Sequence, residues 1–129
     1  MILLLDTSTP DCSLKLVEND TVLVDDTWHA DRELAEKIFT YLHKKMSSVG
    51  KDWSDISGIG MFQGPGSFTG LRIGATVVNT LSHTQHIPVV GVSGDDWQRH
   101  ALDRLENNED DKIILPDYGR PARITSPRK

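Results

Sequence analysis

A glycine-rich turn between two apolar segments constrains the fold of this chain most. The stretch GMFQGPGSFTGLRIGATVVNTL, residues 60–81, joins a short apolar run to a helical pattern. Its GPG triplet is typical of a tight turn, and Ser67 stands where an N-cap would close the first amides of a helix. The stretch therefore predicts a strand, a turn and a helix that begins near Phe68.

The same glycines do not match a standard phosphate-binding loop. Gly64 and Gly70 are six residues apart, and Leu71 stands where a Walker A loop needs lysine. A dinucleotide fingerprint fails as well, because its third glycine would fall on Thr69. We interpret the stretch as a strand-to-helix connection, and weak anion binding at the helix start is the alternative.

Composition indicates an ordinary soluble globular protein. The 129 residues fit one domain, with 37% hydrophobic and 26% charged residues. The net charge of −5 argues against a surface that grips nucleic acid as a whole. Cys12 is the single cysteine, which excludes internal disulfides.

The two ends of the sequence are read as ordinary termini. The opening MILLL meets Asp6 at once and lacks a basic leader, so we expect neither a signal peptide nor a membrane span, and a cytoplasmic protein. The basic residues of the end, Arg120, Arg123, Arg128 and Lys129, are interpreted as a solvated terminus.

Hydrophobic periodicity predicts a mixed five-stranded sheet with three helices. The strands are expected at residues 2–6, 12–18, 21–28, 56–62 and 86–93, and the helices at 31–49, 68–85 and 94–105. The first strand, ILLLD, is apolar on both faces and should be central. Residues 1–109 would form the domain, followed by an extended tail, 110–129, with at most a short strand at 113–115.

The helix expected at 68–85 carries two apolar stripes. One consists of Leu71, Ala75 and Val78, and the other of Gly70, Ile73 and Val77. The sheet can cover one stripe, and either the first helix or a second protein chain must cover the other. Gly70 and Gly74 would let a neighbouring backbone approach closely. The pattern alone leaves an internal helix pair and an intermolecular interface equally open.

Catalytic signals are sparse. Asp6 ends the first strand before TSTP, where a carboxylate and hydroxyls could meet a nucleotide, but we favour a turn satisfied by its own side chains. The five histidines lack the spacing of a metal site, and no serine hydrolase elbow occurs. We therefore predict no catalytic residue, no metal and no cofactor.

The order of the pieces LLLDTSTPDCSLKL, HADREL, GPGSFTGLRIG and IPVVGVS resembles the TsaB family, also called YeaZ. The match covers roughly residues 1–100. Members of that family are bacterial subunits of the machinery that places threonylcarbamoyl on adenosine 37 of tRNA. The resemblance implies an α/β fold of the ribonuclease H-like, actin-like kind, of which this chain holds the first half.

The resemblance also implies a role. In the related catalytic family, TsaD, metal-binding histidines follow a strand end, whereas Gly94 and Gln98 occupy those places here. It implies a non-catalytic scaffold that pairs through its first two helices with a TsaD-like catalytic subunit or with itself. A TsaE-like ATPase in the same complex is a further expected partner, and tRNA is contacted only indirectly. The partner-binding residues expected from this are Leu34, Ile38, Tyr41, Gly70, Ile73, Gly74 and Val77.

Two rival hypotheses remain. One is a small ATPase or ribonuclease H-like nuclease centred on Asp6, which would require magnesium-dependent turnover. The other is a degenerate family fragment that folds poorly, because a half-fold exposes the surface that its other half would cover.

Overall fold

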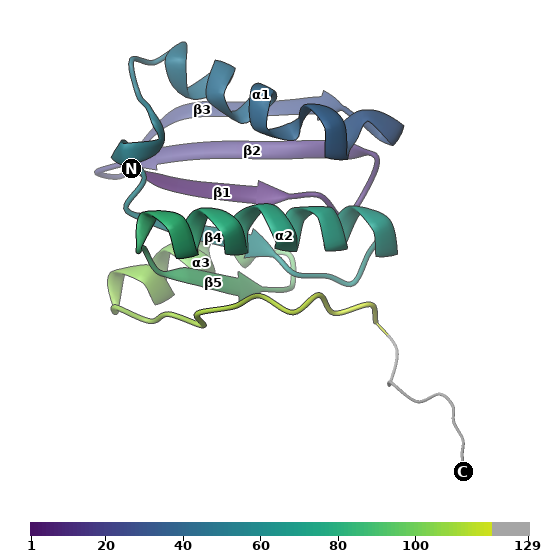
Figure 1. Ribbon diagram of the computed structural model, residues 1–129. Helices are drawn as coiled ribbons and strands as arrows, with labels where there is room; N and C mark the ends of the chain where they lie inside the picture. The colour runs from purple at the N-terminus through teal and green to yellow at the C-terminus, as the bar shows by residue number, and fades with distance from the viewer. Residues whose placement is uncertain (120–129) are drawn as a thin grey trace.

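A mixed sheet of five strands runs through the middle of the molecule, with helices on both of its faces (Figure 1). The computed structural model describes residues 1–119. The strands lie in the order β3-β2-β1-β4-β5. They are β1 (Ile2–Asp6), β2 (Asp11–Glu18), β3 (Thr21–His29), β4 (Gly58–Phe62) and β5 (Val89–Val92). The first three strands are antiparallel neighbours, whereas β4 and β5 run parallel to β1.

The apolar run of β1 explains its central position. Leu3 and Leu5 point into the larger core, and Leu4 points to the opposite face into the smaller one. All three side chains are buried, because each face of the strand is covered by helices. The prediction of a central first strand is confirmed.

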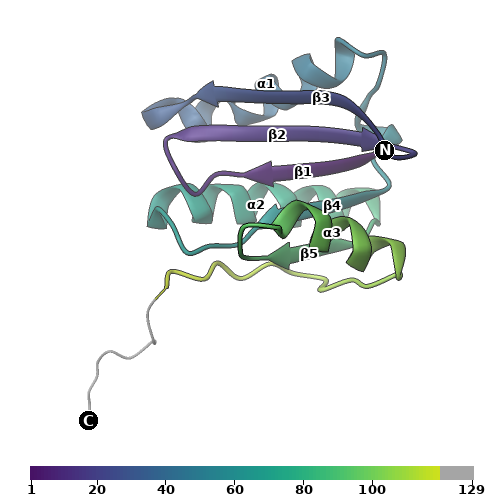
Figure 2. The ribbon, with the colours of Figure 1, turned by 180° about the vertical axis from the view of Figure 1, so that it is seen from behind.

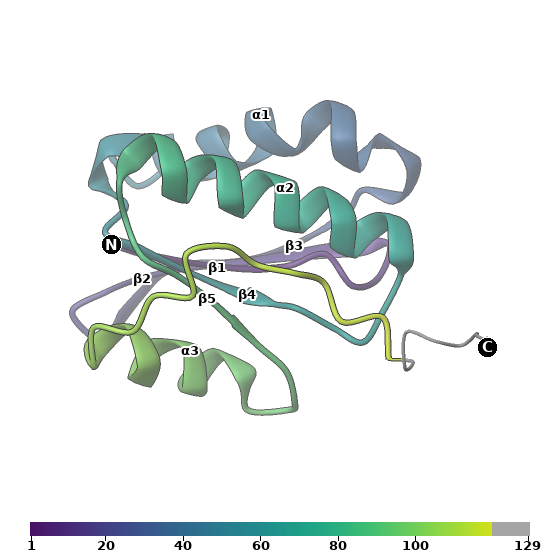
Figure 3. The same ribbon diagram turned by 60° about the horizontal axis from the view of Figure 1, so that its bottom comes forward.

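Two helices cover one face of the sheet and a third covers part of the other (Figure 3). α1 (Leu34–Ser47) and α2 (Phe68–Gln85) pack over the larger core. α3 (Trp97–Glu106) packs over β4 and β5 on the reverse face, where Figure 2 shows it in front of the sheet. α2 begins at the predicted residue, and the Ser67 hydroxyl accepts the Gly70 N–H at 3.2 Å.

Several boundaries differ from the predictions for local reasons. Residues 31–33 form a 3-10 turn, Asp31–Glu33, before α1 begins. β5 is shorter than predicted at both ends. α3 begins three residues later than predicted, because Gly94 has a φ of +98° that no α-helix accepts. At 113–115, where the prediction allowed at most a short strand, the described chain forms no strand, and Ile113 lies in a bend.

The last described residues run back along the molecule beside β5 and α2 (Figure 3). Ile114 is buried in the larger core, and the Asp117 N–H donates to the Gln63 carbonyl at 2.7 Å. The remainder of the predicted tail, residues 120–129 with its basic side chains, lies outside the described residues.

Candidate partner-binding groove between α1 and α2

An open groove of about 300 Å³ lies between α1 and α2. Figure 1 shows these two helices in front of the sheet. It is lined by Ala35, Ile38 and Phe39 of α1 and by Thr69, Arg72, Ile73, Thr76 and Val77 of α2. These residues recur at intervals of three or four on each helix, so the two helices present facing ridges. Ile38 and Val77 are buried and form the floor, whereas Ala35, Thr69 and Thr76 are exposed at the rim.

Phe39 gives the groove an exposed aromatic wall. Its side chain is 42% exposed, and its ring meets that of Trp53 edge to face, with centroids 6.1 Å apart. Trp53 in turn stacks on His43 at 5.9 Å. An aromatic ring that is held in place yet open to solvent is typical of the anchors of protein interfaces.

Arg72 contributes the charge. Among the described residues that line the groove it is the one charged side chain, and no ion pair within residues 1–119 engages it. Its guanidinium carbon lies 5.5 Å from the centre of the Phe68 ring, so the cation rests on an aromatic face. The groove therefore combines an apolar surface with a single unpaired cation.

The two glycines of the predicted partner-binding set lie against the Thr7 that follows β1. A Cβ at Gly70 would overlap the Thr7 carbonyl, and one at Gly74 would overlap the Thr7 hydroxyl. That hydroxyl donates to the Gly70 carbonyl at 2.7 Å, which fixes α2 against the end of β1. Both glycines are buried and allow close packing of the helix on its own sheet.

The other predicted residues divide between the core and the groove. Leu34 is buried beneath α1. Tyr41 faces β3, where it stacks on Trp28 at 4.8 Å and donates to an Asp26 oxygen at 2.7 Å. Ile38, Val77 and the half-buried Ile73 do line the groove. Only Ile73 of the seven presents partly exposed side-chain surface there.

Sequence reasoning missed the rim residues. Phe39 lies outside the apolar stripe by which the first helix was recognised, and Arg72 lies on the polar line of the second. One sequence signal could have identified this rim: Phe39 is a large aromatic residue outside the apolar stripe of its helix, and the small residue Ala35 lies one turn before it.

The surroundings of Asp6 and Cys12 are those of structural residues. An Asp6 oxygen accepts the Ser8 N–H at 2.9 Å, as in the turn that we favoured. Burial, with smaller contributions from Asp6 and Asp26, raises the pKa of the Cys12 thiol to about 12, so it stays protonated at neutral pH.

Within residues 1–119, no three His, Cys, Asp or Glu side chains are grouped as they would be around a metal ion. None of the described helices has the length and apolarity needed to cross a membrane.

A second hollow, of about 680 Å³, lies between α1 and the edge strand β3. Its walls mix Lys37, Lys44 and Lys45 with Glu36 and Asp26. Lys37 and Lys45 already pair with acidic neighbours, Glu33 and Asp26. This hollow therefore differs from the groove in its charge: five Lys, Asp and Glu side chains line it, whereas Arg72 is the one charged residue that lines the groove.

Comparisons with known proteins give a consistent result. Residues 28–113 match the model of the family described as TsaD, tRNA N6-adenosine threonylcarbamoyltransferase. The chain is 32% identical over 92 residues to the tRNA threonylcarbamoyladenosine biosynthesis protein TsaB of Bacillus subtilis, covering 71% of this chain and 40% of the relative. It is 34% identical over 95 residues to the protein of the same name from Escherichia coli, covering 71% and 39%.

A solved structure agrees. YeaZ from Pseudomonas aeruginosa superposes with a TM-score of 0.66 at 32% identity, over 71% of this chain and 43% of that one. This likeness confirms the predicted fold, a ribonuclease H-like, actin-like half-domain with a mixed five-stranded sheet and three α-helices. The chain spans about two fifths of the length of the curated relatives that it matches.

Proposed function

Because this chain belongs to the TsaB (YeaZ) family and matches the TsaD model over most of its length, we propose that it serves the same tRNA modification. In this proposal it is a cytoplasmic, non-catalytic scaffold for the formation of N6-threonylcarbamoyladenosine at position 37 of tRNA. It docks on a TsaD-like catalytic subunit. In this proposal, tRNA and any TsaE-like ATPase bind the resulting complex and not the isolated chain.

The observation that carries the proposal is the groove between α1 and α2. It is apolar, open to solvent and formed by two helices whose other faces are anchored in the core. Exposed Phe39 and half-buried Ile73 can enter a partner's surface, while buried Ile38 and Val77 keep the floor rigid. Apolar area removed from water by docking would contribute about 25 cal/mol per Å² before the costs of association.

The non-catalytic part of the proposal rests on the chemistry of Asp6. Its carboxylate already serves the turn to Ser8, and the Thr7 hydroxyl is used by α2. Within residues 1–119, no group of three His, Cys, Asp or Glu side chains includes Asp6 in an arrangement that could hold a metal ion.

The test is complex formation with the TsaD-like subunit of the same organism. We expect the tagged chain to copurify with that subunit, and Thr76→Arg at the groove rim to reduce the complex at least tenfold. The matched control is Thr27→Arg, which places the same side chain on the opposite face of the sheet, where Thr27 pairs with Ser13.

Three outcomes are informative. Loss of complex in Thr76→Arg alone, together with depletion of threonylcarbamoyladenosine in cells, supports the proposal. If the chain pairs only with itself through the groove, its partner is a second copy of this chain, and the proposed docking on the catalytic subunit is wrong. Equal binding by both variants would overturn the groove as the docking site.

A further inference from the structure

The last described residues of the chain run alongside α2, on the side of that helix away from α1. We name residues 110–119 the strap. In Figure 1 the strap lies along the side of α2 that faces away from α1, and Figure 3 shows it crossing beside β5. It runs antiparallel to α2, since Ile114 contacts Asn79 in the middle of the helix and Tyr118 contacts Phe68 at its start.

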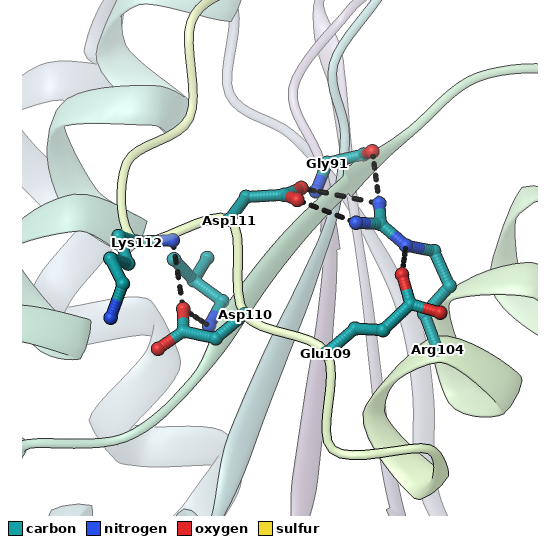
Figure 4. A network of polar contacts seen from close by, with 7 residues as sticks. Gly91, Arg104, Glu109, Asp110, Asp111 and Lys112 are labelled. Atoms are coloured by element: carbon teal, nitrogen blue, oxygen red, sulfur yellow. Dashed lines mark hydrogen bonds and ion pairs between the residues drawn. The ribbon is translucent and has the colours of Figure 1, made fainter.

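Hydrogen bonds anchor the strap backbone at both ends and in the middle. At its beginning, the Asp111 N–H donates to the Val89 carbonyl at 2.8 Å, and the Asp111 carboxylate accepts the Gly91 N–H at 2.8 Å. Arg104 of α3 pairs with the same carboxylate and donates to the Gly91 carbonyl at 3.0 Å (Figure 4). The outer edge of β5 is thereby occupied.

Hydrogen bonds also hold the middle and the far end of the strap. The Asn79 side chain accepts the Ile114 N–H at 2.7 Å and donates to the Ile114 carbonyl at 3.1 Å, which satisfies both backbone groups of a buried residue. The Asp117 N–H bonds to Gln63, as described above. The strap is therefore a fixed element of the surface rather than a loose terminus.

This fixed segment nevertheless exposes large apolar side chains. Leu115 is 72% exposed and Ile113 is 58% exposed. Together with Tyr118 and Phe68, they make up four of the six large hydrophobic side chains that are exposed among residues 1–119. A backbone that is held in place while its apolar side chains face solvent resembles an interface more than a terminus.

A chain of contacts links the strap to the groove. The Tyr118 and Phe68 rings pack at a centroid distance of 4.6 Å, and Arg72 lies on Phe68. Arg72 is itself a lining residue of the groove. A line of contacts thus joins the groove, through Arg72 and Phe68, to Tyr118 of the strap.

From this continuity we infer that the strap is part of the docking surface for the partner that occupies the groove. The inference rests on the proposed function and extends it. The partner is the TsaD-like subunit, and the surface that fits here is apolar, with a carboxylate facing Arg72, because that cation has no counter-charge in the described chain. Leu115 and Tyr118 are the strap residues expected to be buried in the complex.

The experiment measures affinity for the purified TsaD-like subunit with the full chain carrying Leu115→Asp. We expect at least a tenfold loss of affinity and an unchanged melting temperature, because Leu115 is 72% exposed to solvent. The matched control is Val22→Asp on β3, which also replaces an exposed aliphatic residue and should bind as the wild type does.

The groove variant separates the two proposals. If Thr76→Arg abolishes binding while both strap variants, Leu115→Asp and Tyr118→Ala, bind like the wild type, the strap inference is wrong and the proposed function stands. If neither variant weakens binding, the groove is overturned as the docking site as well, and absence of any complex with the wild-type chain would overturn the proposed function. Tyr118→Ala provides a second strap variant, and wild-type affinity in both strap variants would overturn the inference.

Discussion

Gly70, Ile73 and Val77 form one apolar stripe in the sequence, yet the structure divides these residues between two flanks of α2 and uses the flanks in opposite ways. The flank that contains Gly70 and Gly74 packs so closely on Thr7 that a single added carbon atom would collide. The flank that contains Ile73 faces α1 across an open groove. Glycine therefore marks the contact that the chain makes with itself, and in our proposal the larger side chains mark the surface that docks on a partner.

The variant with the largest expected effect on stability is Gly74→Leu, which tests the flank of α2 that packs on Thr7. A side chain here must displace the Thr7 hydroxyl and the Met61 methyl group from the core, so we expect a destabilisation of about 1–3 kcal/mol or more. Thermal unfolding followed by circular dichroism would show a fall in melting temperature of several degrees.

The control is Thr80→Leu, which makes a similar change at an exposed position of the same helix and should leave the melting temperature within about 2 °C of the wild type. A Gly74→Leu protein that folds normally but fails to pair with its partner would reverse our assignment of the two flanks.

A second variant tests the strap side of α2. Asn79→Leu would leave the backbone N–H and carbonyl of buried Ile114 without partners, at a cost of about 1–3 kcal/mol. Hydrogen exchange at the Ile114 amide should accelerate markedly. Unchanged protection of that amide would mean that Asn79 does not hold the strap.

A third variant tests the groove side. Phe39→Ala removes one edge-to-face aromatic contact with Trp53 at a partly exposed position, so we expect a loss of only about 0.5–1.5 kcal/mol. Urea unfolding would measure it. A loss as large as that of Gly74→Leu would show that Phe39 is a core residue and not a free wall of the groove.

The smallest effect concerns pH. Burial alone would raise the pKa of Asp111, but hydrogen bonds from Arg104 and the Gly91 N–H outweigh it and hold the pKa below its ordinary value. The folded state therefore gains stability above the unfolded-state pKa, near 4, and loses it as the pH falls further. Asp111→Asn should remove part of the acid sensitivity in unfolding measured from pH 6 to pH 2. An unchanged pH profile would contradict this role for the carboxylate.

The fold was largely predictable because each signal was local. The run ILLLD, the GPGS turn and the helical stripes each follow from periodicity or from capping, and the structure places them as expected. The division of the chain at residue 109 stays a prediction, although residues 110–119 pack on the domain.

The groove was only partly predictable. Two apolar stripes indicate that a helix has two neighbours, but periodicity does not say which neighbour is the chain's own sheet. The contact of Gly74 with Thr7 joins residues 67 positions apart, so no local pattern reveals it. The strap was missed for the same reason, because side-chain bonds such as those of Asn79 hold it and no repeating pattern accompanies them.

Hydrogen exchange of the chain, alone and mixed with the TsaD-like subunit, tests the account most directly. We predict slower exchange in the complex for the facing turns of α1 and α2, residues 35–39 and 69–77, with unchanged exchange in β2 and β3. Protection confined to the β3 edge, or no protection in either helix when the proteins are mixed at high concentration, would contradict it.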